Sequence, residues 1–210
     1  MPGSDVVVIG GSAGGITALR GIFETFHDIR DRFVFVVLHR APQYGGLAEV
    51  LQGFTTIPIH EPSTSPWNCT SGEVTLAPAG YHLLAGNERR RAREPHTPIE
   101  QYDTGSGLRA HLTLDGPVLC SRPSLDVLFA SAAQLVNSVT AVLLSCASED
   151  GADGCQIVKA AGGRVVLQDP ASCEAAIAVN AALRKVEPDH VADPQGIGRW
   201  LSAEPDAHRR

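Results

Sequence analysis

Apolar residues in this chain gather in short unbroken runs instead of alternating with polar residues. Four runs are rich in β-branched side chains, at residues 6–9, 33–38, 139–144 and 165–167. A strand that is buried on both faces carries apolar side chains at every position, as in a parallel sheet covered by helices. The four runs therefore predict the central strands of such a sheet.

Between these runs the apolar positions recur at helical spacing. They do so at residues 16–26, after a pair of glycines, and again at residues 125–135, where Ser124 is a suitable N-cap. Residues 152–161 and 175–186 are further helix candidates. Strands that alternate with helices predict an α/β fold, with a doubly wound, mostly parallel sheet flanked by helices and right-handed crossovers.

The middle of the chain has a different composition. Residues 55–120 are rich in Pro, Gly, Ser and Thr, and three short segments within them predict an antiparallel, hairpin-rich insert on the main sheet. These segments are residues 73–77, 81–85 and 108–114. The pattern indicates a single domain at residues 1–202, followed by a frayed tail at residues 203–210.

Charge narrows the range of partners. The 210-residue chain has a formal net charge of −6, with 43% hydrophobic and 19% charged residues. This composition is typical of a globular domain with a full core. It creates no overall positive field, so neither nucleic-acid binding nor membrane insertion is expected. The basic run at residues 89–93 is interpreted as a solvated loop, with a docking patch for an acidic partner as the alternative.

Cysteine usage and the N-terminus bear on the compartment. The five cysteines include no C-x-x-C pair, which argues against a disulfide framework or a zinc site. The N-terminus lacks the basic region and long apolar region of a secretory signal. No apolar stretch approaches the roughly 18 residues that a membrane span needs. We therefore expect a cytoplasmic protein in a reducing environment.

Three polar residues follow three of the predicted strands. Ser12 comes after the run at residues 6–9, His39 directly after Leu38, and Asp150 shortly after Leu144. In open parallel sheets, ligands bind beyond the carboxyl ends of the strands. The three side chains are therefore expected to share one edge of the sheet. There an imidazole could activate a serine hydroxyl while a carboxylate orients the imidazole.

The segment Gly10-Gly11-Ser12-Ala13-Gly14 matches the G-x-S-x-G pattern between a strand and a helix. A sterically lean turn would expose the Ser12 hydroxyl, and the amides of the following helix would face a developing oxyanion. The alternative is that Ser12 only caps the helix. A nucleotide-binding function is less favoured, because neither the G-x-G-x-x-G nor the Walker A spacing is present.

The histidine and the acid also have structural alternatives. His39 could be a solvent-facing loop histidine, and Asp150 could cap the helix that starts near Gly151. A calcium site built from Glu149, Asp150 and Asp153 is not favoured, because the EF-hand ligand spacing is missing.

Other reactive side chains are assigned to the structure. His82 is the nearest rival of His39, and we interpret it as part of the hairpin insert, either structural or lining the cleft. Cys146 and Cys173 have no flanking signature of a catalytic cysteine, so both are interpreted as buried thiols.

Several segments together resemble those of a known family. They are VIGGSAGG at residues 8–15, VVLH at 36–39, SGEV at 71–74, APAGYH at 77–82, RPSLDVLF at 122–129, DGADG at 150–154 and QDPASC at 168–173. The chain resembles the catalytic domain of CheB-type chemotaxis protein-glutamate methylesterases from about Val6 to Leu201.

This resemblance implies a Ser-His-Asp hydrolase that removes methyl esters from glutamate side chains of chemoreceptors and releases methanol. The family often also deamidates receptor glutamines. By position, Ser12 would be the nucleophile, His39 the general base and then acid, and Asp150 the orienting acid. No metal or organic cofactor is implied. The expected substrate is a methyl-accepting chemoreceptor or a related signalling protein.

Departures from the family pattern leave an alternative open. The family usually has Gly-Met-Gly before the acid motif, where this chain has Cys146-Ala147-Ser148, and Arg40 is bulkier than the usual residue after the histidine. The backbone amides of Ala13 and Ala147 are the expected oxyanion donors. No receiver domain is expected in this chain, so a separate receiver protein would regulate it. The alternative is a catalytically weakened relative that serves as a signalling module or acts on another ester.

Overall fold

The computed structural model describes residues 5–27, 29–43, 45–87, 107–135 and 138–203. Its main sheet has seven strands in the order β10-β9-β8-β1-β2-β5-β3, and each pair of neighbouring strands is parallel. The strands are β1 (Asp5–Gly11), β2 (Arg32–Leu38), β3 (Ile59–His60), β5 (Val74–Leu76), β8 (Val139–Leu143), β9 (Arg164–Gln168) and β10 (His190–Ala192). The four strands predicted from unbroken apolar runs are thereby confirmed.

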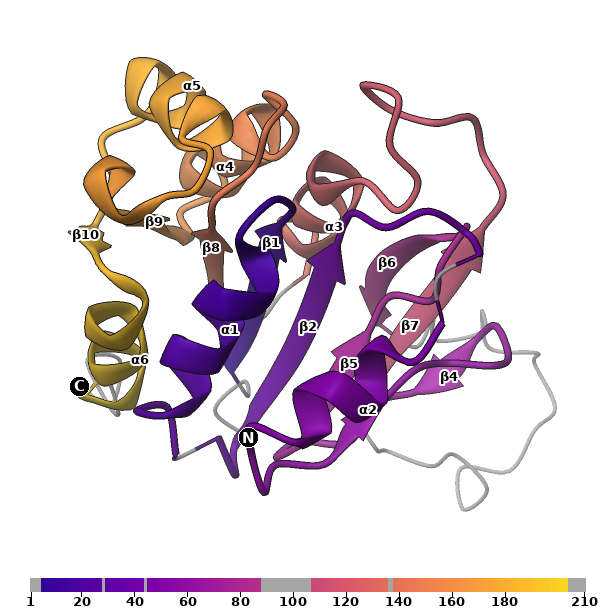
Figure 1. Cartoon of the computed structure of the whole chain (residues 1–210). Helices are drawn as coiled ribbons and strands as arrows, with labels where there is room; N and C mark the ends of the chain where they lie inside the picture. The colour runs from indigo at the N-terminus through magenta and orange to yellow at the C-terminus, as the bar shows by residue number, and fades with distance from the viewer. Residues whose placement is uncertain (1–4, 28, 44, 88–106, 136–137, 204–210) are drawn as a thin grey trace, which may run out of the picture.

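Helices cover both faces of this sheet, which explains why its central strands are apolar at every position (Figure 1). On one face the core includes α1 (Gly15–Phe23), α2 (Leu47–Gln52) and α6 (Pro194–Ala203), packed on Val7 and Ile9 of β1. The other face packs Val6 and Val8 against a second helix group. These helices are α3 (Leu125–Ala132), α4 (Ala152–Ala160) and α5 (Ile177–Lys185).

The predicted helices are present, with boundaries decided by local capping. Ser124 is the N-cap of α3, as predicted, and its side chain accepts a hydrogen bond from the Val127 amide. α1 ends at Phe23, three residues earlier than the apolar spacing suggested, yet Phe26 is still fully buried in the core. Apolar spacing reports burial, and a buried residue just past a helix continues the pattern.

The insert contains a separate antiparallel sheet, as predicted. Its strands are β4 (Trp67–Asn68), β6 (His82–Asn87) and β7 (Leu108–Thr113), in the order β4-β7-β6. The small sheet packs on α3, where the Ala85 amide donates to the Ser131 hydroxyl at 3.0 Å.

One segment of the insert does not follow that prediction. Residues 73–77 were expected in an antiparallel hairpin, but β5 joins the main sheet between β2 and β3, parallel to both. The expectation was wrong because Val74, Thr75 and Leu76 are all buried, as in the central strands, and the surrounding Pro- and Gly-rich sequence obscured so short a run. The strands β3 and β10 and the helices α2 and α6 were not predicted either.

Two further expectations fall at the margins of the described chain. The basic run at residues 89–93 lies outside the described residues. Ala203, assigned to the tail, is the last residue of α6, and residues 204–210 are not among those described. Within the described residues, no helix is long and apolar enough to cross a membrane.

The contact between α3 and α4 depends on a glycine. A Cβ atom on Gly154 would lie 2.6 Å from the Cβ of Phe129, which is fully buried. We expect Gly154→Ala to lower the free energy of unfolding by about 1–3 kcal/mol through overpacking. Gly45→Ala is the control, because nothing lies within 4 Å of that position. Its effect should stay within about 0.5 kcal/mol. Equal midpoints of chemical denaturation for both variants would contradict this account of the helix contact.

Candidate active site

Three chain segments leave the sheet side by side at its carboxyl edge. The His39 amide donates to the Gly11 carbonyl at 3.1 Å, and the Ser12 amide donates to the Ser145 carbonyl at 2.9 Å. β1 lies between β2 and β8, so the residues after these strands meet at its end. The helix after β1 and the helix before β8 cover opposite faces, as expected at a topological switch point. The predicted meeting of Ser12, His39 and Asp150 at one edge therefore follows from the topology.

His39 and Asp150 form the closest contact of this site. His39 Nε2 lies 2.7 Å from Asp150 Oδ2, and the Asp150 side chain is completely buried. A carboxylate so deeply buried requires compensating hydrogen bonds. The start of α3 supplies them: the Ser124 hydroxyl donates at 2.8 Å, the Leu125 amide at 2.8 Å and the Asp126 amide at 3.0 Å.

These contacts decide the charge of Asp150. Burial alone would raise the pKa of its carboxyl, but the hydrogen bond from His39 and those from the start of α3 hold the pKa below its ordinary value. The positive end of the α3 dipole acts in the same direction. Asp150 is therefore a carboxylate that can orient an imidazole and stabilise its charged form.

The charge of His39 follows from the same contacts. Burial lowers its pKa, but hydrogen bonds with Asp150 and Cys146 outweigh burial and raise the pKa to about 9. The protonated ring is therefore favoured in the resting site at neutral pH. The proton has to be lost before the imidazole can act as a base.

The orientation of the His39 ring is defined at both nitrogens. Since Nε2 faces Asp150, Nδ1 is the nitrogen available for proton transfer. Nδ1 lies 3.3 Å from the Ser121 hydroxyl oxygen and 3.9 Å from Cys146 Sγ. Among the hydrogen bonds of the described residues, none joins the Ser12 hydroxyl to His39. The structure thus brings the histidine and the acid together and leaves Ser12 on the adjacent strand exit.

The turn at Ser12 does not act as a helix cap. The N-cap of α1 is Gly14, which has a φ of 76° and makes no side-chain capping bond. A Cβ atom there would also lie 2.8 Å from Glu174 Cβ. The glycine thus permits a left-handed turn in a crowded place. Ser12 lies half-buried just before this turn, so the capping alternative for Ser12 is wrong.

The capping alternative for Asp150 is wrong as well. α4 begins after Gly151, whose φ of 99° makes it the N-cap. The Asp126 carboxylate instead accepts the amides at that helix start, from Gly151 at 2.9 Å and from Gly154 at 2.6 Å. Burial and the neighbouring charge of Asp150 raise the pKa of Asp126 to about 6. Asp126 was missed from the sequence, because nothing in its local pattern indicates a partner in the next helix.

His82 has a structural function. It is buried, its Nδ1 accepts the Ser124 amide at 3.2 Å, and its Nε2 lies 3.1 Å from the Gly116 carbonyl oxygen. His82 therefore supports the start of α3, which in turn holds Asp150.

The two cysteines considered from the sequence differ in environment. Cys173 is only half-buried, so the prediction of a buried thiol is wrong for this residue. Partial burial still raises the pKa of its thiol to about 11, which disfavours the reactive thiolate. Cys146 is fully buried, as expected, but it contacts His39, and this interaction and the contact with Ser148 lower its pKa despite burial. The contact with His39 was not foreseen.

The two expected oxyanion donors differ in exposure. Ala13 is half-buried beside Ser12, and Ala147 is exposed in the loop that leads to Asp150. Within the described residues neither amide has a hydrogen-bond partner, so both remain available to a substrate oxygen.

The family model for the CheB methylesterase matches residues 7–201. This chain belongs to the CheB methylesterase family.

Curated relatives agree with this family assignment. A Leptospira interrogans protein, provisionally named protein-glutamate methylesterase/protein-glutamine glutaminase, is 32% identical over 92% of this chain and 91% of its own length. A Natronomonas pharaonis protein with the same two activities in its name is 34% identical, over 78% of this chain but only 42% of its own length. Among solved structures, the CheB methylesterase catalytic domain of Thermotoga maritima covers 97% of this chain with a TM-score of 0.79. At 22% identity, that likeness supports the fold alone.

Arg40, a departure noted from the sequence, is bound to segments of the insert. Its guanidinium group forms an ion pair with Glu61 and donates to the Ala77 carbonyl at 2.8 Å. Arg40 thereby ties the end of β2 to the segments that follow β3 and β5. The Arg40 side chain is 8% exposed, and its Nε and Nη1 have no hydrogen-bond partner among the described residues.

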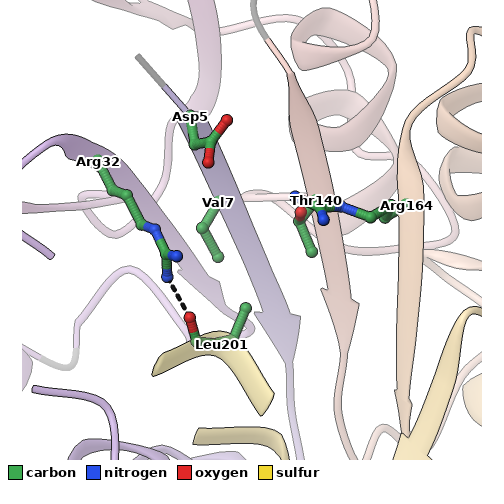
Figure 2. Close-up of a pocket in the computed structure, with 6 residues that line it drawn as sticks. All are labelled: Asp5, Val7, Arg32, Thr140, Arg164 and Leu201. Atoms are coloured by element: carbon green, nitrogen blue, oxygen red, sulfur yellow. Dashed lines mark hydrogen bonds between the residues drawn. The ribbon is translucent and has the colours of Figure 1, made fainter. Parts of the chain in front are cut away.

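Two cavities of the structure lie away from Ser12, His39 and Asp150. One is at the amino ends of the strands (Figure 2). Its volume of about 10 Å³ is just large enough for one water molecule. Its lining residues are Asp5, Val7, Arg32, Thr140, Arg164 and Leu201. A second, of about 60 Å³, lies between the end of α3 and the end of α4. In the described part of the chain, no group of three His, Cys, Asp or Glu residues could hold a metal ion, Glu149, Asp150 and Asp153 included.

Removing the carboxylate should change the titration of His39. In the wild type we expect a pKa of about 9 for His39, measured by NMR of histidine-labelled protein. In Asp150→Asn the pKa should fall by about one unit or more, because burial then acts with less opposition. Asp189→Asn, which removes a carboxylate paired with Lys159 beside β9, should leave the His39 pKa unchanged. A wild-type value near 6.5 would contradict the strong pairing with Asp150.

Proposed function

We propose that this protein is a protein-glutamate methylesterase that hydrolyses γ-methyl esters of glutamate side chains in chemoreceptor proteins. In this proposal Ser12 is the nucleophile, His39 the general base and acid, and Asp150 the orienting carboxylate. The observation that carries it is the buried 2.7 Å contact between His39 and Asp150, directly beside the turn that presents Ser12. Family membership and the names of the relatives support the same activity.

The reaction begins with transfer of the Ser12 proton to His39 Nδ1. The serine oxygen forms a bond to the ester carbonyl carbon, and the carbonyl oxygen becomes an oxyanion. The amides of Ala13 and Ala147 would stabilise this oxyanion, a contribution of about 10²–10³ in rate for one donor in other hydrolases. Asp150 stabilises the imidazolium through Nε2.

The second half of the reaction returns the proton. The C–O bond to the methoxy group breaks, and the imidazolium protonates the leaving methanol. A water molecule then gives a proton to Nδ1 and attacks the acyl carbon. The bond between that carbon and the Ser12 oxygen breaks, and the imidazolium returns the proton to the Ser12 oxygen. The products are the free Ser12 hydroxyl and a glutamic acid side chain, which ionises to the carboxylate in water.

The same groups could hydrolyse an amide, with ammonia as the leaving group in place of methanol. The relatives carry glutaminase activity in their names, so deamidation of receptor glutamines is part of the proposal. It uses the same acyl-enzyme and needs no further residue.

A weakened relative remains the second candidate. Two observations favour it: the missing hydrogen bond between Ser12 and His39, and the side chains at Cys146-Ala147-Ser148 in place of two glycines. Such a protein would act as a signalling module or on another ester. A cytoplasmic location and regulation by a separate receiver protein stay predictions.

Replacement of the nucleophile is the direct test. Wild-type protein should react with a fluorophosphonate probe and release methanol from methylated receptor, whereas Ser12→Ala should not label and should lose about 10⁴–10⁶ in kcat. Ser202→Ala should retain both activities, because Ser202 lies at the end of α6, next to Leu201 at the amino ends of the strands. Labelling of Ser12 without methanol release would favour another ester as substrate, and unchanged turnover in Ser12→Ala would remove Ser12 from the mechanism.

The rate should depend on pH through His39. Only the neutral imidazole accepts the Ser12 proton, so labelling should increase as the pH rises toward about 9, the pKa of His39. The rising part of this pH–rate profile is called the pH limb below. Cys146→Ala should move the pH limb to lower pH, because the contact with Cys146 contributes to raising the pKa of His39. The measurement is the second-order rate of fluorophosphonate labelling across the pH range. A rate already constant from neutral pH upward would contradict the raised pKa of His39, and a rate that does not rise with pH anywhere in the range would contradict its assignment as the base.

A further inference from the structure

The loop before α3 brings a second serine to the catalytic histidine. The Ser121 hydroxyl oxygen lies 3.3 Å from His39 Nδ1, the nitrogen that must exchange a proton with Ser12. Within the described residues, His39 is the only hydrogen-bond partner of this hydroxyl. Ser121 is half-buried and directly precedes the segment RPSLDVLF at residues 122–129. Its hydroxyl is therefore used in the active site and not in support of its own loop.

The loop itself is a tight turn with an unusual backbone. Val118 and Ser121 exchange two backbone hydrogen bonds, at 3.0 Å and 2.8 Å. Between them, Leu119 and Cys120 have φ values of 45° and 65°, in the left-handed region that residues with a Cβ atom rarely adopt. Backbone strain of this kind persists where the surroundings hold it, often at functional sites. The turn places Ser121 at a defined position.

Contacts outside the turn hold the rest of the loop. The Arg122 guanidinium donates to the carbonyl oxygens of Leu114 at 2.9 Å and Asp115 at 3.1 Å. The His82 ring lies 3.1 Å from the Gly116 carbonyl oxygen and also accepts the amide of Ser124. The loop is thus tied to the segment that holds Asp150. Both partners of the His39 ring, Ser121 and Asp150, are positioned from the same region.

The other groups around His39 complete its environment. Asp150 faces Nε2, and Asp126 lies behind Asp150 at the start of α3. Cys146, from the loop after β8, lies 3.9 Å from Nδ1, farther than Ser121. The adjacent Arg40 is paired with Glu61. Of these groups, only the Ser121 hydroxyl offers an uncharged oxygen acceptor to the Nδ1 proton.

We propose that Ser121 is a positioning residue of this active site, whose hydroxyl oxygen accepts the Nδ1 proton of charged His39 and keeps Nε2 turned toward Asp150. The inference rests on the proposed function, since it assigns Ser121 a part in the same proton transfer. When Ser12 loses its proton to Nδ1, the new N–H bond has an acceptor ready. A hydrogen bond to a charged group is stronger than one between neutral groups, so Ser121 favours the imidazolium over the neutral ring.

Four variants test this function. Ser121→Ala removes the hydroxyl; Ser121→Thr keeps a hydroxyl, and Ser121→Val has the shape of Thr without it. Cys120→Gly is the matched control, since it changes the same turn, relieves a strained φ and makes no contact with His39. The measurement is the rate of fluorophosphonate labelling at Ser12, identified by peptide mapping, from roughly pH 6 to 10 around the histidine titration.

In Ser121→Ala and Ser121→Val, we expect the pH limb of labelling to move down by about half to one unit, because the imidazolium loses an acceptor. The rate on the high-pH plateau should fall by about 3- to 10-fold. Ser121→Thr and Cys120→Gly should keep the wild-type limb. The Thr and Val pair carries the comparison if near-UV circular dichroism shows that the Ala variant has lost its native packing.

Other outcomes would overturn the inference. An unchanged limb in both the Ala and Val variants means that Ser121 does not stabilise the charged ring, and an upward shift means that it stabilises the neutral ring instead. Labelling found on Ser121 in the Ser12→Ala variant would make it a nucleophile and not a positioning residue. If the wild type fails to label at Ser12, the proposed function itself fails. If the wild type labels at Ser12 and the Ser121 variants label with the same pH profile, only the inference about Ser121 fails.

Discussion

The structure of this site depends on one buried negative charge. Asp150 has no exposure to solvent, and its charge is stable only because the start of α3 and the ring of His39 surround it with donors. The loop that carries Asp150, the helix that carries Ser124 and the strand that carries His39 must therefore be in register. The same requirement that stabilises the carboxylate also places the catalytic histidine.

In the proposed triad, the two ring nitrogens of His39 have defined partners. Nε2 is bound to the acid, and Nδ1 faces Ser121 and Cys146. In the common serine-protease arrangement the two nitrogens have the opposite partners. The chemistry is unaffected, because either nitrogen of imidazole can be the base when the other is held by a carboxylate. The consequence is that the residues around Nδ1, here Ser121 and Cys146, determine how the base behaves.

This chain has the fold of the CheB family and departs from the family pattern in residues that adjoin His39 in the sequence or in space. Several of the family motifs in the sequence lie at the strand ends and at the start of α3, where Ser12, His39 and the partners of Asp150 are found. The departures, Cys146-Ala147-Ser148 and Arg40, lie next to the triad. Cys146 raises the pKa of His39, whereas Arg40 is paired with Glu61 and acts on the sheet edge. Family membership therefore indicates the reaction, whereas the pH dependence of the rate depends on the neighbours of His39 in this chain.

The sequence by itself determined the central parallel strands, the helices between them and the common edge of Ser12, His39 and Asp150. Each of these follows from local patterns, since unbroken apolar runs report burial on both faces and parallel strands end together. Only the tertiary structure decided that residues 74–76 extend the main sheet, that Gly14 and Gly151 cap the helices, and that Ser121 and Cys146 flank His39. Those contacts join loops that are far apart in the chain. Their residue types carry no local signal, because hydrogen-bond partners are chosen by where the loops meet and not by periodicity.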